Sequence, residues 1–251
     1  MKMPKIFTCV DRLSNIFKAP NKKSEVVSQI LFGEEFFVKK TNNQFYKGCS
    51  TFDKYSGFVL KKNFKKISAE KKYRITIKKV SLFSGPNLLK KTKKELLFNS
   101  QVCIQEERNN FIKIGKFWIK KNSIKKINNS SNNFLEKIKY FSKTRYLWGG
   151  NSIKGIDCSG LVQELLKSIN KKCPRDSKDQ LAFFKKSVSL SGIKKGDLLF
   201  WKGHVAIALN KQSLVHAYGP KKRVIVMPIK KTIKTLLETK NLKILSIKRP
   251  L

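Results

Sequence analysis

The sequence predicts an α+β protein in which two small β-barrels precede a mixed domain of helices and strands. Three observations lead to this prediction. The first half contains an internal repeat, and a polar stretch, "INNSSNN" at 127–133, follows it. The second half carries helix-spaced apolar residues first and strand-like runs afterwards, which is typical of an α+β domain. We therefore expect domains at residues 1–68, 69–127 and 128–251.

The repeat covers most of the first half. "APNKKSEVVSQILFGEEFFV" starts at Ala19 and "GPNLLKKTKKELLFNSQVCI" starts at Gly85, and both place Leu-Phe at the same distance after Pro-Asn. The two copies also end alike, with "KKNFKKI" at 61–67 and "KKNSIKKI" at 120–127. Within each copy, short alternating segments such as "EEFFVKK" and "NFIKIGKFWI" are broken by turn residues. This pattern predicts two small β-barrels.

The second half begins with helices. Residues 134–141 carry apolar side chains at helical spacing, and so do residues 161–169, so the second helix should begin at or just after Cys158. We expect a third helix in "PRDSKDQLAFFKK", with Asp176 or Ser177 as its N-cap. The runs "GDLLFW", "HVAIALN", "SLVHAYG", "RVIVMPI" and "LKILSIK" then predict the strands of a sheet.

Composition limits the class of protein. Hydrophobic residues make up 40% of the chain, which indicates a globular protein. The sequence has no apolar run of the length a transmembrane helix needs, and its N-terminus does not resemble a signal peptide. We therefore expect a cytoplasmic protein, with the cell envelope as the alternative. The five cysteines form no C-x-x-C pair, so we expect neither a disulfide framework nor a bound metal.

The formal net charge of +40 suggests a polyanionic partner, such as nucleic acid, an anionic envelope polymer or a membrane face. However, the lysines are spread along the whole chain, and the abundance of Lys, Asn, Ile and Phe is also what an AT-rich genome produces. The sequence has no basic motif interleaved with aromatic residues. We therefore expect no specific nucleic-acid partner and leave contact with an anionic polymer open.

Cys158 is the candidate nucleophile, and His204 and His216 are the only histidines of the chain. A cysteine at a helix N-terminus gains from the helix dipole, which lowers its pKa, and one histidine can act as its base while the other orients that base. The alternative is a structural cysteine with two histidines at strand ends. The ordered combination of helix start and two strand histidines favours catalysis.

The segments "YLWGGNSIKGIDCSGLVQ", "PRDSKDQ", "KKGDLLFWKGHVAIAL" and "LVHAYG", in this order, resemble the NlpC family of cell-wall cysteine peptidases. That family has a papain-like fold with a Cys-His-His arrangement. The resemblance implies that Cys158 is the nucleophile, His204 the general base and His216 the orienting residue. It implies no metal and no other cofactor.

The same resemblance implies that Tyr146 lines the site and helps to hold the oxyanion. It also implies that polar residues around the cysteine contact the peptide substrate. The residues matched to substrate-contacting positions are Asp157, Ser159, Asp176 and Ser177. For Asp157, Asp176 and Ser177, a helix-capping role is an equal alternative.

"LFGEEFFV…YSGFVL" resembles the bacterial SH3-like module, and two such modules before an NlpC domain resemble γ-D-glutamyl-L-diamino-acid endopeptidases. Those enzymes cut peptidoglycan stem peptides between D-Glu and the diamino acid, and their first module restricts the cleft to substrates with a free N-terminal L-Ala. Glu34 and Tyr55 are then the candidates for binding this amine, with Glu35 as an equal contender. A carboxylate suits the task, because a desolvated ammonium group needs a countercharge.

The sequence thus predicts a papain-like NlpC peptidase with two N-terminal SH3-like barrels, acting on murein-derived peptides. One alternative is an exported hydrolase of intact peptidoglycan, held to the envelope by its charge. Another is a non-catalytic SH3-like binding or scaffold protein.

Overall fold

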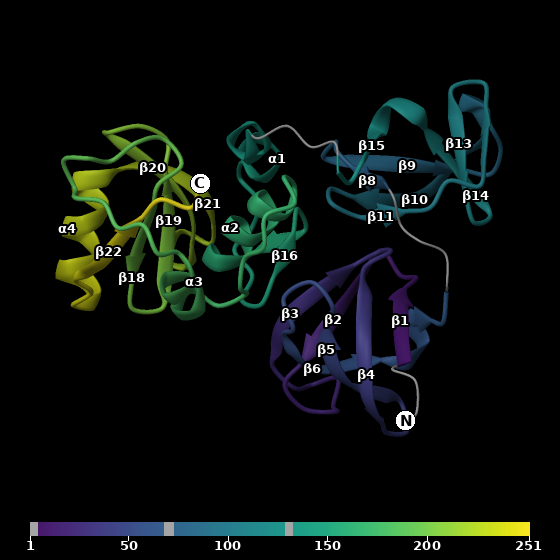
Figure 1. Ribbon diagram of the computed structural model, residues 1–251, viewed down its shortest axis with the longest axis horizontal. Helices are drawn as coiled ribbons and strands as arrows, with labels where there is room; N and C mark the ends of the chain where they lie inside the picture. Colours follow the sequence, from purple (N-terminus) through teal and green to yellow (C-terminus); the bar gives the residue numbers. More distant parts are fainter. Residues whose placement is uncertain (1–4, 68–72, 129–132) are drawn as a thin grey trace. The chain divides into compact units, whose positions relative to one another are not determined.

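The computed structural model describes residues 5–67, 73–128 and 133–251 (Figure 1). These residues form two compact units. One holds the strands that precede residue 128, and the other holds residues 133–167 and 171–251. The expected boundary between residues 68 and 69, and most of the polar stretch at 127–133, lie outside the described residues.

The first seven strands form one antiparallel sheet in the order β3-β2-β6-β5-β4-β1-β7. Alternate side chains, among them Ile16, Phe36 and Val59, point into a common apolar core, as the alternating sequence pattern predicts. The strands are β1 (Lys5–Cys9), β2 (Leu13–Phe17), β3 (Val26–Leu31), β4 (Glu35–Thr41), β5 (Phe45–Ser50), β6 (Ser56–Leu60) and β7 (Phe64–Lys65), with a 3₁₀ turn at Lys61–Asn63.

The next eight strands form two antiparallel sheets, in the orders β10-β9-β14-β13-β12 and β11-β8-β15. Ile75, Ile112 and Ile119 lie at the centre of their shared core and are fully buried. The strands are β8 (Tyr73–Ile75), β9 (Lys79–Phe83), β10 (Lys91–Leu97), β11 (Gln101–Val102), β12 (Glu106–Arg108), β13 (Phe111–Ile114), β14 (Phe117–Lys120) and β15 (Ile124–Lys126), with 3₁₀ turns at Leu88–Lys90 and Lys121–Ser123.

Gly33 and Asn99 occupy equivalent turns in the two copies of the repeat. Both have a left-handed backbone, with φ of 81° and 68°. In each turn, the N–H of the following residue donates to a carbonyl three residues earlier, at 3.1 Å in the first copy and 3.0 Å in the second. Asparagine is one of the few residues besides glycine that adopt this conformation readily, so the sequence difference preserves the turn.

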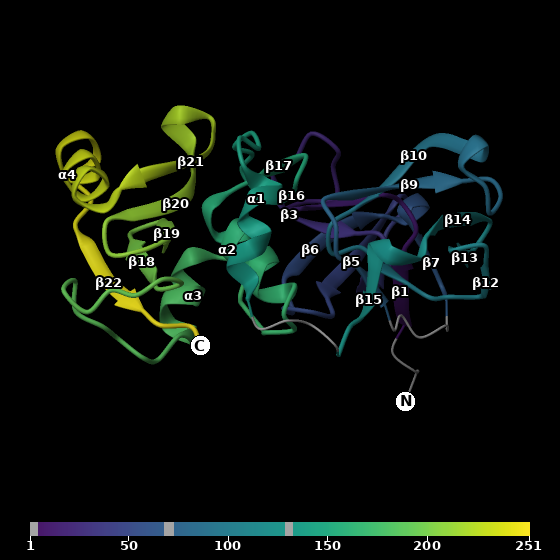
Figure 2. The ribbon, with the colours of Figure 1, turned by 90° about the horizontal axis from the view of Figure 1, so that it is seen from above.

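The second unit is built on an antiparallel sheet of order β21-β20-β19-β18-β22. Helix α2 packs against β19 and β20, and α4 lies on the opposite face of the sheet (Figures 1 and 2). Ile229 and Leu236 of α4 pack into the apolar cluster on that face. The strands are β16 (Asn151–Ser152), β17 (Gly155–Ile156), β18 (Leu198–Trp201), β19 (His204–Ala208), β20 (Ser213–Tyr218), β21 (Arg223–Pro228) and β22 (Ile244–Lys248). The helices are α1 (Ile138–Phe141), α2 (Cys158–Lys167), α3 (Ser177–Phe183) and α4 (Ile229–Lys240), with 3₁₀ turns at Phe134–Lys137 and Gly219–Lys221.

Two helices differ from the sequence expectation. The first expected helix is a 3₁₀ turn followed by the short α1, and it ends where Ser142 turns extended and Lys143 adopts a left-handed φ of 58°. Helix α4 was not predicted, although Ile229, Ile233 and Leu236 have helical spacing. No helix in the described part of the chain is long and apolar enough to cross a membrane.

Candidate active site

Helix α2 begins at Cys158 because Asp157 caps it. The Asp157 Oδ1 atom accepts a hydrogen bond from the N–H of Gly160 at 2.7 Å, which satisfies one of the free donors at the helix start. A side chain at position 160 would not fit, since a Cβ there would lie 2.4 Å from the carbonyl oxygen of Gly150. This packed turn holds Cys158 at the first position of the helix, with 6% of its surface exposed.

Both carboxylate oxygens of Asp157 are occupied inside the protein. Arg175 Nη1 donates to Oδ1 at 2.9 Å and Arg175 Nη2 donates to Oδ2, while the N–H of Gly149 donates to Oδ2 at 2.9 Å. The Ser159 hydroxyl donates to Oδ1 at 3.2 Å and accepts from Arg175 Nη1 at 3.0 Å. For Asp157 this geometry favours the capping role over substrate contact, and the Ser159 hydroxyl belongs to the same network.

Arg175 is the residue of this site that sequence reasoning missed. It lies inside the motif "PRDSKDQ", but nothing in a single sequence marks an arginine as buried. Gln180 Nε2 donates to the Ser159 carbonyl at 2.9 Å, which ties α3 to the start of α2. Asp176 stands at the N-cap position of α3, is exposed and makes no side-chain capping bond, and Ser177 is the first residue of that helix.

The Cys158 thiol lies beside the start of β19. Its Sγ atom is 4.0 Å from the carbonyl oxygen of Gly203, and the N–H of Val205 donates a hydrogen bond to the sulfur. Gly203 and Val205 directly precede and follow His204 in the sequence, so the sulfur contacts the backbone on both sides of that histidine. Among the described residues, no hydrogen bond joins the sulfur to a histidine nitrogen. Catalytic hydrogen bonds are often loose without substrate and tighten when substrate binds.

The two histidines form a pair. His204 Nε2 and His216 Nδ1 are 2.9 Å apart, so Nδ1 is the His204 nitrogen left for the thiol. The His216 ring stacks on Tyr218, with centroids 4.6 Å apart and planes 8° from parallel. Trp201 and Tyr218 flank His204, at 5.8 and 6.0 Å between ring centroids. Aromatic packing therefore fixes both imidazoles.

Burial raises the pKa of the Cys158 thiol to about 12, and the negative charge of Asp157 adds to this effect. The hydrogen bonds from Val205 and Ser159 and the charge of Arg175 act in the opposite direction but are weaker. The sequence led us to expect a pKa lowered by the helix dipole. The difference arises because desolvation of a buried thiolate outweighs the favourable end of a single helix.

Burial has the corresponding effect on the histidines. It lowers the pKa of His204 to about 4, with a smaller contribution from the charge of Lys240. It lowers the pKa of His216 to about 3, and His204 contributes further. At neutral pH, the thiol and both imidazoles are therefore uncharged. A neutral imidazole can act as a general base toward a neutral thiol that comes within hydrogen-bond reach.

Tyr146 lies close to the cysteine. Burial raises the pKa of its hydroxyl, and the negative charge of Asp157 raises it further, so the hydroxyl keeps its proton at neutral pH. The Tyr146 N–H donates to the carbonyl of Lys222 at 2.8 Å, which fixes the backbone there. The structure thus places Tyr146 close to Cys158 and Asp157, and its role toward the oxyanion stays a prediction.

Glu34 and Tyr55 lie in the first unit, in the first barrel. Glu34 is 8% exposed, and its Oε2 accepts from the N–H of Leu31 at 2.8 Å within its own turn. Tyr55 packs against the barrel core, and its N–H donates to Asp53 Oδ1 at 3.0 Å. Glu35 is half-buried at the start of β4.

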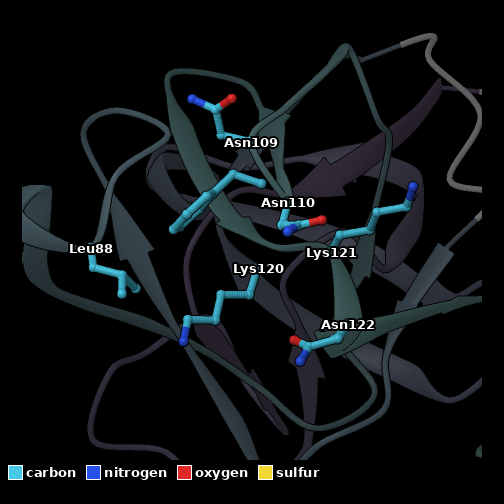
Figure 3. A pocket seen from close by; sticks show the side chains of 7 residues that line it. Leu88, Asn109, Asn110, Lys120, Lys121 and Asn122 are labelled. Carbon is cyan, nitrogen blue, oxygen red and sulfur yellow. The ribbon is translucent and has the colours of Figure 1, made fainter.

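The second barrel carries a surface pocket of about 680 Å³, which Figure 3 shows from close by. Three amide side chains and two lysines line it (Figure 3), and Phe111 is also among its lining residues. None of the sequence-predicted site residues lines this pocket. The lining residues are Leu88, Asn109, Asn110, Phe111, Lys120, Lys121 and Asn122.

The comparisons with known proteins agree with this geometry. Residues 143–238, which include Cys158 and both histidines, match the model of the NlpC/P60 family. The chain carries an NlpC/P60 domain. Residues 16–64 match the model described as a bacterial dipeptidyl-peptidase SH3 domain. The crystal structure of an NlpC/P60 family protein from Bacillus cereus covers 98% of this chain and 99% of its own, with a TM-score of 0.80 and 18% identity. The protein therefore has the NlpC/P60 fold with an N-terminal SH3-like domain, as predicted.

Two curated relatives each match part of this chain of 251 residues. One is dipeptidyl-peptidase 6 of Lysinibacillus sphaericus, 42% identical over 30% of this chain and 27% of its own length. The other is the γ-D-glutamyl-L-lysine dipeptidyl-peptidase of Bacillus subtilis, 35% identical over 38% of this chain and 34% of its own. The aligned parts thus span between about a quarter and a third of these relatives' length.

Proposed function

We propose that the NlpC/P60 protein is a cysteine peptidase that cleaves the γ-D-glutamyl–diamino acid bond of murein-derived peptides carrying a free N-terminal L-Ala. The observation that carries this proposal is the capped cysteine beside the start of β19, where His204 forms a hydrogen bond with His216. The match to a dipeptidyl-peptidase SH3 domain and the names of the two relatives support the substrate class.

The neutral groups of the site define a general-base mechanism. As the Cys158 sulfur attacks the γ-carbonyl carbon, Nδ1 of His204 takes the thiol proton, so a free thiolate never has to persist in the buried site. The hydroxyl of Tyr146, which keeps its proton, donates to the oxyanion that forms. His204 then returns the proton to the departing amine. Water hydrolyses the thioester that remains, with His204 again as base.

A carboxylate of the first barrel would bind the substrate amine. Glu34 and Glu35 remain the candidates, with Tyr55 as the third candidate residue of the same barrel. Because the Glu34 carboxylate already accepts a backbone hydrogen bond, we expect Glu35→Gln to weaken the use of free-amine substrates more than Glu34→Gln does. A rise in KM confined to unblocked peptides is the expected signature.

The decisive experiment offers purified protein L-Ala-γ-D-Glu-L-Lys and the matching diaminopimelate peptide, each with a free or an acetylated N-terminus. Release of L-Ala-D-Glu from free-amine peptides alone is the expected result. Cys158→Ala should abolish cleavage, while Cys103→Ala, which alters a half-buried thiol of the second barrel, should not. Cleavage by the Cys158→Ala variant, or release from no peptide at all, would overturn the proposal.

The net charge of +40 favours one second candidate, an envelope hydrolase that binds anionic polymers and cuts intact peptidoglycan. The same experiment separates the two. A hydrolase of this kind should cut acetylated peptides and purified sacculi as well as free peptides. The first proposal places the enzyme in the cytoplasm, where released peptides are recycled, and the second places it in the cell envelope.

A further inference from the structure

His216 has a second partner that the proposed mechanism does not use. Its Nε2 atom lies 3.3 Å from the thioether sulfur of Met227. Met227 is on β21, and in the strand register its neighbour Ile225 stands directly opposite His216. Side chains two positions apart on one strand share a face, so a long side chain at 227 reaches the imidazole diagonally.

The chemistry of sulfur decides the proton positions. A thioether accepts hydrogen bonds weakly and carries no proton to donate, so a hydrogen bond at this contact requires Nε2 of His216 as the donor. A neutral imidazole has one N–H, and Nδ1 of His216 is then an acceptor. His204 Nε2, at 2.9 Å, must donate to it. Nδ1 of His204 is left without a proton.

We infer that Met227 is a positioning residue that sets the tautomers of the histidine pair and leaves His204 Nδ1 free to accept the thiol proton. The opposite arrangement would place a proton on His216 Nδ1, turn His204 Nε2 into an acceptor and put the remaining proton on His204 Nδ1. That nitrogen then has no lone pair for the cysteine. The catalytic part of this inference rests on the proposed function, whereas the tautomers do not.

The test combines spectroscopy with kinetics. Because the chain has only two histidines, ¹⁵N-labelled imidazoles give two sets of signals, and the set that disappears in His216→Asn belongs to His216. We expect the proton on Nε2 in both rings. Met227→Leu keeps the volume but removes the acceptor, so His216 should populate both tautomers. Loss of one weak hydrogen bond should lower kcat by roughly 3- to 10-fold and leave KM unchanged.

Two further variants complete the design. Met227→Gln restores an acceptor and should return both the tautomers and kcat toward wild type. Ile225→Leu alters packing opposite His216 without touching the hydrogen bond, and should change neither. A proton on Nδ1 of His216 in the wild type, or unchanged tautomers and kcat in Met227→Leu, would overturn the inference. Tautomers that shift as expected in a protein that cleaves no peptide would instead refute the proposed function alone.

Discussion

Arg175 forms a bidentate ion pair with Asp157, the residue that directly precedes the candidate nucleophile Cys158. The Nη1–Oδ1 distance is 2.9 Å, and Nη2 donates to the second carboxylate oxygen. Both side chains are almost entirely buried, at 1% and 7% exposure. The pair therefore joins the segment before α3 to the capped start of α2, and it fixes the position from which Cys158 projects.

Removing the guanidinium should destabilise the second unit. Arg175→Met leaves the Asp157 carboxylate buried without its countercharge, which we expect to lower the free energy of unfolding by about 3–5 kcal/mol. Arg175→Lys keeps the charge but loses the paired hydrogen bonds, so its loss should be smaller. Urea unfolding measures both. Lys234→Met is the matched control, because its ion pair with Glu238 is exposed and should contribute little.

Thiol reactivity should reveal the protonation state of the site. With a Cys158 pKa of about 12, alkylation by iodoacetamide should rise about tenfold per pH unit from pH 7 to 10. Mass spectrometry of the peptide containing Cys158 separates it from the other four cysteines. A rate that is already constant between pH 5 and 8 would instead indicate a resting thiolate–imidazolium pair, contrary to this structure.

The histidine pair should make the fold sensitive to acid. The pKa values of His204 and His216 fall from 6.5 to about 4 and about 3 in the folded state, so the unfolded chain takes up protons first as the pH drops below 6.5. Stability should therefore fall as the pH drops from 6.5 toward 4, with each histidine contributing at most about 1 kcal/mol per pH unit. Urea unfolding across this range measures the slope. The double variant His204→Gln/His216→Gln should flatten it, and an equal slope in that variant would contradict the assignment.

Substitutions at the two equivalent turns of the repeat, at Gly33 and Asn99, should change the stability of the protein by different amounts. A Cβ at Gly33 would lie 1.9 Å from the carbonyl oxygen of Gln101, so Gly33→Ala adds a backbone clash to the strain of a left-handed alanine. We expect it to cost roughly 2–4 kcal/mol. Asn99→Gly, at the equivalent position, should change stability by less than about 1 kcal/mol. Thermal unfolding of both variants measures the two losses of stability. Equal losses would contradict the conclusion that both turns require a left-handed backbone.

Much of the architecture could be predicted because local pattern controls it. Alternating segments gave the strands of both barrels, and the change to helical spacing placed the start of α2 at Cys158. The equivalence of Gly33 and Asn99 was visible as a repeat, and their φ values explain it. Helix α4 was missed because its apolar positions, such as Ile233 and Leu236, are separated by lysines and threonines that resemble a polar connection.

The site could be predicted only in part. Cys158, His204 and His216 are chemically conspicuous and rare, so their order along the chain pointed to a nucleophile and its bases. Their roles stay a prediction until cleavage is measured. Arg175 and Met227 were invisible, because an arginine among many lysines and a methionine in a strand carry no signal of their partners.

The sequence by itself determined which elements form, since turn residues and apolar periodicity act over a few neighbours. It also determined which side chains could do chemistry. Only the tertiary structure decided the electrostatics of those side chains. Burial of Cys158 raises its pKa where the helix start alone would have lowered it, because desolvation depends on every segment packed around the sulfur. In the same way, Met227 meets His216 only because β20 and β21 pair in one register, so the proton positions of the site are a property of the sheet.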